Sequence, residues 1–177
     1  MAGDDRVWRQ IMRHAAMQTS QAKESHVKVG VLSDDRGRES VGQGVTVIEL
    51  AAIHEFGAPG AGVPERSFIR AAMKRHEKDL ERVTAALARK YITGELSLEK
   101  ALNQLGAVSS AWIKKFIADD QVMPPTGAEQ NTRKNRRAGK PDDAETTTLI
   151  DTGRLMNAIT WKVWLGRARD ARGRFAK

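Results

Sequence analysis

The sequence between residues 50 and 72 reads LAAIHEFGAPGAGVPERSFIRAA, and the fold is set by the way this stretch starts and stops helices. Just before it, Thr46 and Glu49 have the spacing of a capping box, in which two side chains satisfy free backbone N–H groups of the first helical turn. This spacing predicts a short helix over residues 47–56. Gly57 then stands where a helix ends in a left-handed backbone conformation, which glycine adopts without steric cost.

Beyond this helix the sequence predicts a loop and then a helical hairpin. Residues 58–65 hold two prolines and two glycines, a composition that excludes regular structure. Apolar side chains then recur at helical spacing over residues 67–92, and Gly94 ends that helix. A second apolar stripe begins at Ser97. Two long helices joined by so few residues predict an antiparallel hairpin.

The outer segments predict a further helix and two strands. Residues 5–25 carry an amphipathic helical pattern, and three valines in strict alternation predict a first strand at about residues 27–32. Residues 33–44 are rich in glycine, serine and charge, and predict a loop or a loose hairpin. Alternation returns at about residues 159–165, which predicts the last strand.

Together these elements predict an α+β fold. Its small antiparallel sheet includes the first and last strands and is packed by the N-terminal helix and the long α-helical hairpin. A two-stranded ribbon is marginal alone, so it needs helix cover, a third strand from residues 33–45, or a neighbouring subunit. We expect a single domain over residues 1–165, with an extended polar and basic loop at residues 119–148, and a basic tail at residues 166–177.

The composition excludes several classes of protein. The chain has 177 residues, a formal net charge of +8 and no cysteine. The lack of cysteine excludes disulfide scaffolds, thiolate metal sites and cysteine nucleophiles. The sequence has no apolar run long enough to cross a bilayer, and its first residues lack the apolar core of a signal peptide. We therefore expect a soluble protein made in the cytosol.

The positive charge is concentrated in two segments. Residues 131–140 hold five positive charges and no negative one, and the tail from residue 166 is also basic. Accumulated positive charge binds phosphates without reading bases, and it also suits an acidic protein surface. A solvated, charged segment is the alternative interpretation of each. The candidate contacts with DNA or an acidic partner are Arg133, Lys134, Arg136, Arg137, Lys140, Arg167, Arg169, Arg172 and Arg174.

A search of the sequence for catalytic chemistry gives no credible site. His54 and Glu55 resemble the opening of a zinc-protease motif, but no second histidine follows at the helical spacing that a metal needs. The glycines of residues 57–62 lack the lysine and the strand-to-helix context of a phosphate loop. Paired carboxylates lie in polar segments, where burial does not tune their pKa. We therefore expect a protein that is not an enzyme, with no cofactor and no metal.

Two stretches together carry a family resemblance. One is residues 50–72, and the other is residues 149–163, LIDTGRLMNAITWKV. In this order and spacing they resemble the tail-completion and head–tail joining proteins of tailed bacteriophages, also described as neck or virion morphogenesis proteins. The resemblance covers roughly residues 7–165. The basic insertion at residues 131–140 and the arginine-rich tail depart from the family pattern and take no role from it.

The resemblance implies a structural virion protein of the phage neck, assembled in the bacterial host cytoplasm. Copies of the chain would form a ring, sixfold or a multiple of it, that completes the tail and joins it to the head connector around the DNA channel. The implied partners are portal-side proteins, tail tube or terminator proteins and packaged double-stranded DNA, with no membrane. Two alternatives stay open: a tail terminator that caps the tail tube, and a basic DNA-binding accessory protein.

Twelve residues of the two stretches form the candidate structural and interface motif. They are His54, Glu55, Phe56, Gly57, Pro64, Arg66, Phe68, Asp151, Thr152, Gly153, Arg154 and Leu155. We expect His54 and Glu55 to cap and orient the end of the first helix. Phe56 and Phe68 would anchor the two sides of the loop to the core, and Arg66 would bind Glu55 or the carbonyls freed at the helix end.

In the second stretch, we expect Asp151 to cap a short helix and to fix the backbone of Thr152 and Gly153. Arg154 would point to a partner or to a carboxylate. The alternative interpretation is that the motif residues only shape two turns.

Overall fold

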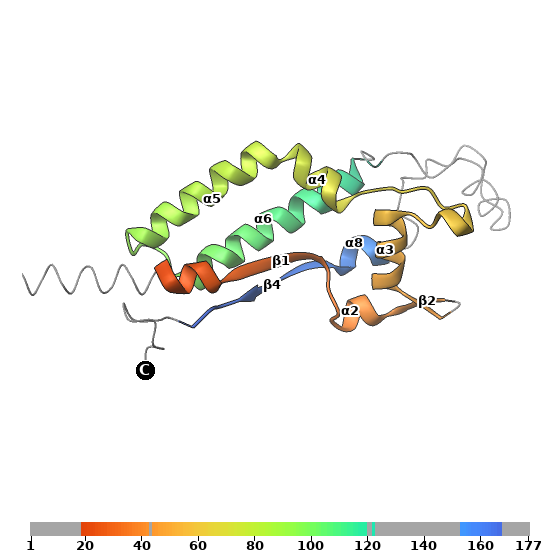
Figure 1. The fold of residues 1–177 in the computed structure, drawn as a ribbon, viewed down its shortest axis with the longest axis horizontal. Coiled ribbons are helices and arrows are strands. Elements are labelled where there is room, and N and C mark those ends of the chain that lie inside the picture. The colour runs from red at the N-terminus through yellow and green to blue at the C-terminus, as the bar shows by residue number, and fades with distance from the viewer. Residues whose placement is uncertain (1–18, 43, 120–121, 123–152, 168–177) are drawn as a thin grey trace, which may run out of the picture. The chain divides into compact units, whose positions relative to one another are not determined.

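The computed structural model describes residues 19–42, 44–119, 122 and 153–167, and it confirms the predicted α+β class (Figure 1). Residues 19–24 are helical, as expected for the end of the N-terminal helix, whose residues 5–18 lie outside the described ranges. In the described part of the chain, no helix combines the length and apolarity that a membrane span requires. The elements that follow are β1 His26–Val31, α2 Asp35–Arg38, β2 Ser40–Gly42, β3 Val45–Thr46, α3 Val47–Phe56, a 3-10 turn Pro59–Ala61, α4 Ile69–Arg75, α5 Glu77–Ile92, α6 Leu98–Ala118, α8 Arg154–Ala158 and β4 Ile159–Trp164.

The first and last strands pair with each other, as the sequence predicts. β1 and β4 form a two-stranded antiparallel sheet, and they lie side by side in Figure 1. Of the loop and the loose hairpin expected at residues 33–44, the structure has the hairpin, because β2 pairs with β3 in a second antiparallel sheet; the short helix α2, which was not expected, precedes it. The carboxylate of Asp34 starts α2 by accepting a hydrogen bond from the backbone N–H of Gly37 at 3.0 Å. The strand β3 therefore pairs with β2 directly before α3 and does not extend the β1–β4 sheet.

The chain divides into two compact units. One, which we call the terminal unit, comprises Met1–Lys28, Glu81–Gly106 and Lys162–Lys177. The other, the core unit, comprises Val29–Leu80 and Ala107–Trp161. In the terminal unit Leu87 and Ala101 are buried, and the backbone N–H of Gly166 donates to Ser25 Oγ at 2.8 Å.

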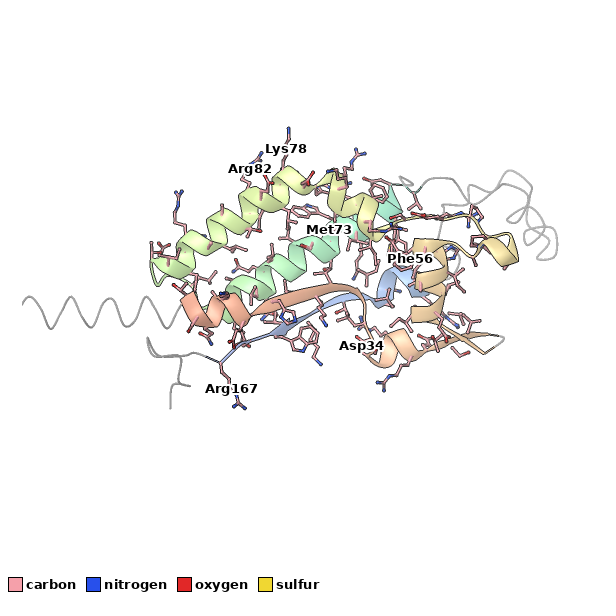
Figure 2. The ribbon with its side chains drawn as sticks, viewed as in Figure 1. Asp34, Phe56, Met73, Lys78, Arg82 and Arg167 are labelled. Atoms are coloured by element: carbon pink, nitrogen blue, oxygen red, sulfur yellow. The ribbon has the colours of Figure 1, made fainter. Side chains whose placement is uncertain are left out.

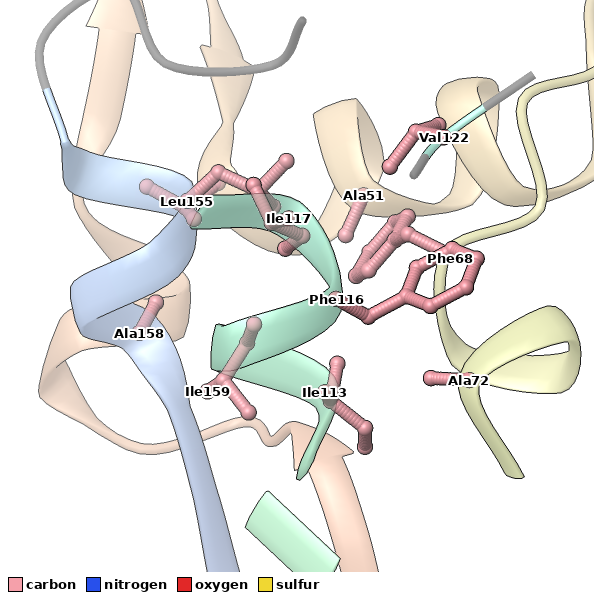
Figure 3. Close-up of a cluster of buried hydrophobic side chains, with 11 residues drawn as sticks. Ala51, Phe68, Ala72, Ile113, Phe116, Ile117, Val122, Leu155, Ala158 and Ile159 are labelled. Carbon is pink, nitrogen blue, oxygen red and sulfur yellow. The ribbon is translucent and has the colours of Figure 1, made fainter. Parts of the chain in front are cut away.

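The core unit contains the main hydrophobic cluster (Figure 3). Helices α3, α4, α6 and α8 all contribute to it, and Phe68, Ile113, Ile117 and Ile159 are among its fully buried side chains. Its members are Val47, Ala51, Phe68, Ala72, Ile113, Phe116, Ile117, Val122, Leu155, Ala158 and Ile159. The two stretches that carry the family resemblance thus both contribute side chains to one core.

The predicted single helix over residues 67–92 is wrong, because the helix breaks at His76 (Figure 1). The backbone of His76 has φ −99° and ψ 16°, outside helical values. Its ring stacks on Trp112 of α6 with ring centroids 4.8 Å apart, and its Nδ1 lies 3.4 Å from a carboxylate oxygen of Asp79. Apolar spacing continues through the break, so periodicity alone does not reveal it. Beyond α5 the chain turns at Gly94, with φ 80°, and α6 begins at Leu98.

Candidate functional site

The capping box is present as the sequence predicts, and it fixes where α3 begins. Thr46 Oγ1 accepts a hydrogen bond from the backbone N–H of Glu49 at 3.4 Å. In return, Glu49 Oε2 accepts from the backbone N–H of Thr46 at 2.8 Å. The backbone N–H of Thr46 and, second, its hydroxyl both donate to the Glu49 carboxylate, and these two hydrogen bonds lower the pKa of Glu49. Because α3 begins at this position, its last turn carries His54, Glu55 and Phe56 next to the loop that follows.

Glu55 is the centre of the site. Its carboxylate is buried and accepts backbone hydrogen bonds from Phe68 and Ile69 at 2.9 Å and from Arg70 at 3.1 Å. It also accepts from Ser67 Oγ at 2.8 Å and pairs with Arg70 Nε at 2.9 Å. The first N–H groups of a helix have no partner within the helix, and a carboxylate there is favoured by the helix dipole. Glu55 therefore caps the start of α4, whereas we had expected it to cap the end of α3.

Burial raises the pKa of Glu55, but hydrogen bonds oppose that effect. Donation by the backbone of Ile69 and Arg70, then by the side chains of Ser67 and Arg70, lowers the pKa more than burial raises it. The net result is a pKa below the ordinary value of 4.5. The folded protein thus holds Glu55 as a carboxylate, the form that accepts all of these hydrogen bonds.

This shift makes stability depend on pH. Because the pKa of Glu55 is lower in the folded chain, its stabilisation is complete above the unfolded value near 4.5, and it is lost as pH falls through the folded value. We expect the free energy of unfolding of the wild-type chain to fall more steeply in acid than that of Glu55→Gln. Urea unfolding followed by circular dichroism, repeated from neutral to acid pH, measures this. Parallel curves for the two proteins would contradict the assignment.

Arg70 links three parts of the site. Its Nη2 donates to the main-chain carbonyl of Glu55 at 2.8 Å and to the carboxylate of Glu65 at 2.7 Å. Its guanidinium lies over the ring of Phe56, 5.1 Å from the centroid. Since its Nε also binds the Glu55 carboxylate, one side chain joins the end of α3, the loop and the start of α4. Arg70 was missed by the sequence analysis.

The expectation for Arg66 was wrong in one part. The Arg66 side chain does not bind Glu55; it is buried, and its Nε has no hydrogen-bond partner among the described residues. The backbone N–H of Arg66 instead donates to the carbonyl of His54 at 2.7 Å, so a carbonyl freed at the end of α3 is satisfied by main chain. One sequence feature pointed to Glu55. Phe68 occupies the N-cap of α4, and its ring offers no acceptor for the free backbone N–H groups of the first helical turn, so a side chain from elsewhere has to supply one.

His54 and the two phenylalanines also differ in part from expectation. His54 Nδ1 is buried and has no hydrogen-bond partner within the described ranges, so this atom does not cap the helix. Burial, followed by the charge of Arg66, lowers the pKa of His54 below 6.5 and keeps the ring neutral. Phe68 is fully buried, as predicted, but Phe56 is 65% exposed and does not anchor the loop to the core.

Gly57 turns the chain out of α3. Its φ of 73° is positive, as predicted, but its ψ of 171° lies outside the left-handed helical region, in a conformation almost restricted to glycine. The loop is more ordered than its composition suggests. It contains the 3-10 turn Pro59–Ala61, and Ala58 and Val63 exchange backbone hydrogen bonds at 2.9 and 3.1 Å. Pro64, which follows this bridge, is exposed.

Alanine at position 57 is expected to destabilise the protein. A Cβ there would lie 2.8 Å from the backbone nitrogen of Glu65, and the backbone conformation would itself be strained. We expect Gly57→Ala to lower the free energy of unfolding by about 2 kcal/mol. Gly60→Ala is the matched control, because a Cβ at Gly60 meets open space. Urea unfolding of both variants measures the difference, and equal stabilities would contradict the prediction.

The second part of the motif begins at Gly153, with φ 71°, at the N-cap of α8. None of the described side chains caps this helix, and Asp151 and Thr152 lie outside the described ranges, so the prediction for Asp151 stays open. Arg154 Nη1 donates to the carbonyl of Ser40 at 3.1 Å, and its Nε lies 3.5 Å from Glu39 Oε1. Arg154 therefore points to a carboxylate of its own chain, one of the two alternatives we expected.

The two parts of the motif meet through helix packing. α3 packs against α8, although the helices are about a hundred residues apart in the chain. Figure 3 shows Leu155 and Ala158 of α8 in the same cluster as Ala51 and Phe68. The structure thus brings His54–Phe68 and Gly153–Leu155 into one unit.

Of the candidate DNA contacts, Arg167 alone lies within the described residues. It is exposed three residues after the end of β4 (Figure 2), whereas the other candidate DNA contacts lie outside the described ranges. Within those ranges, no group of three or more histidine or acidic side chains could hold a metal ion. Comparisons of the chain with protein-family models, curated proteins and solved structures found no match.

Proposed function

We propose that this protein is a structural component of a phage neck that forms a ring, completes the tail and joins it to the head connector around the DNA channel. The observation that carries the proposal is the packing of α3 on α8, which unites the two stretches that resemble this family. In this region Glu55 and Arg70 cap and link helices and Phe68 packs in the core, which supports a structural role. Catalysis would instead require some of these side chains to contact a substrate.

The contact surface of the proposed ring includes Phe56 and the loop beside it. A closed ring requires different patches on the two sides of each subunit. Phe56 is exposed, yet its ring is held by the guanidinium of Arg70, so little side-chain freedom is lost when a neighbour covers it. Exposed aromatic and arginine side chains of this kind often dominate the energy of protein interfaces. Phe56 lies at the loop end of α3 in Figure 2.

The proposal is tested by adding purified protein to extracts of a phage whose gene for this chain is interrupted. Wild-type protein should restore joined, infectious particles. We expect Phe56→Ser to restore at least about tenfold fewer particles while unfolding at the same urea concentration as wild type. The matched control is Ile92→Ser, because Ile92 is another large apolar side chain that is exposed, at 72%, outside the motif.

Each outcome has a direct meaning. Loss of joining with Phe56→Ser and full joining with Ile92→Ser support the proposed contact surface. Equal activity of the two variants removes Phe56 from that surface. Extracts that contain infectious particles without any added protein contradict the joining function itself.

A further inference from the structure

We infer that the exposed face of the β1–β4 sheet, at the end that carries His26, Lys28, Lys162 and Trp164, binds the phosphate backbone of duplex DNA. These four residues, which we call the ribbon cluster, all belong to the terminal unit. The inference does not depend on the proposed neck function, because it concerns the free chain and any duplex.

The ribbon cluster is built by strand alternation. Successive side chains of a strand point to opposite faces, so His26 and Lys28 share one face of β1, and Lys162 and Trp164 share one face of β4. The ring of His26 stacks on Trp164 with centroids 5.4 Å apart and an interplanar angle of 6°. Lys28 Nζ lies 4.9 Å and Lys162 Nζ 5.4 Å from the centroid of the Trp164 ring. Two ammonium groups, one from each strand, thus lie near one indole ring.

The charge of this cluster is not neutralised by the protein. Among the described residues, neither Lys28 nor Lys162 is paired with a carboxylate, and both side chains are exposed. The indole attracts each ammonium but cancels no charge. Two like charges held near one ring repel each other, and a phosphate between or beside them would relieve that repulsion.

The same arrangement favours duplex backbone over exposed bases. A base stacks on an aromatic face that is free, but His26 already covers the Trp164 ring and the two lysines lie near it. Phosphate binding needs only positioned positive charge, and it reads no sequence. The cluster should therefore bind duplexes of different sequence equally.

Charge beyond the strands favours a nucleic acid over an acidic protein. Arg167 is exposed three residues after the end of β4, and the sequence of residues 166–177 holds five basic residues and one acidic residue. An excess of positive charge along the sequence suits a polyanion with regularly spaced phosphates. A protein interface of useful affinity is usually built around an apolar centre, whereas the one large ring of this cluster is covered by His26 and two lysines.

The test uses the full chain and a labelled duplex of mixed sequence. Fluorescence anisotropy over a series of salt concentrations gives the slope of log K against log salt, which reports the number of phosphates contacted. We expect Lys28→Gln combined with Lys162→Gln to weaken binding and to make the slope shallower by about 1.8, since each phosphate contact contributes about 0.9. A second duplex of unrelated sequence should give the same result.

The matched control is Lys78→Gln combined with Lys100→Gln. Both lysines are exposed, Lys78 on α5 and Lys100 on α6, and neither belongs to the ribbon cluster; Figure 2 shows Lys78 pointing outward from α5. This control removes the same total charge but no residue of the ribbon cluster, so it should leave the slope unchanged. Circular dichroism of both double variants verifies that each is folded.

Two results would overturn the inference. Equal changes of slope in the two double variants would show that binding follows net charge and has no site on the β1–β4 sheet. A wild-type chain that binds poly-glutamate but no duplex would assign the cluster to an acidic protein partner instead. A slope change confined to the ribbon variant supports the inference.

Discussion

Replacing Glu55 with alanine is expected to lower the free energy of unfolding by about 4 kcal/mol, because a buried carboxylate with several donors is lost. Three backbone N–H groups at the start of α4 and the hydroxyl of Ser67 would lose their acceptor. The side chain of Arg70 is 56% exposed and can turn to water, so most of the loss comes from the uncapped helix. Urea unfolding of the purified chain measures the change.

Glu65→Ala is the matched control for this prediction. Glu65 also pairs with Arg70, at 2.7 Å, but its side chain is 54% exposed. Ion pairs in that setting contribute little, so we expect a change within about 1 kcal/mol. If the two alanine variants were equally stable, Glu55 would not be the residue that holds α3 and α4 together.

Replacing Phe68 with alanine is the second large effect, an expected loss of about 3 to 5 kcal/mol. Phe68 is fully buried and packs in the main hydrophobic cluster of the core unit. Removing its ring forfeits the transfer energy of a large apolar side chain and leaves a cavity that the surrounding helices fill only in part. Thermal or urea unfolding gives the change directly.

Phe56→Ala serves as the control, since it removes the same ring from the other side of the loop. Phe56 is 65% exposed, and its one described ring contact is with the guanidinium of Arg70. We expect a change within about 1 kcal/mol, the worth of an exposed cation–π contact. A cost equal to that of Phe68→Ala would mean that Phe56 is buried against the core, as the sequence analysis had expected.

The features that sequence predicted well depend on neighbouring residues. The capping box of Thr46 and Glu49 acts within one helical turn, so its spacing alone locates the start of α3. Alternation of valines located β1, and alternation at the other end of the described chain located β4. The pairing of these two strands followed because each needs a partner and few other strands were available.

The features that were missed depend on contacts between distant residues. The break at His76 coincides with the stack on Trp112, which lies on another helix. Glu55 caps a helix that starts after a loop, and whether Arg66 or Arg70 reaches it depends on how that loop turns. Arg70 lies inside α4 with its side chain directed back to the loop, whereas Arg66 precedes the helix and is buried. The spacing of residues in the sequence does not reveal which arginine reaches Glu55.

We propose that the protein joins a phage tail to its head, and electron microscopy tests that proposal most directly. Lysates would be imaged from a phage in which the gene for this chain is interrupted. We expect filled heads beside separate tails of normal length, and overlong or ragged tails would instead assign the tail-terminator role. Normal, infectious virions in those lysates would contradict the proposed joining function.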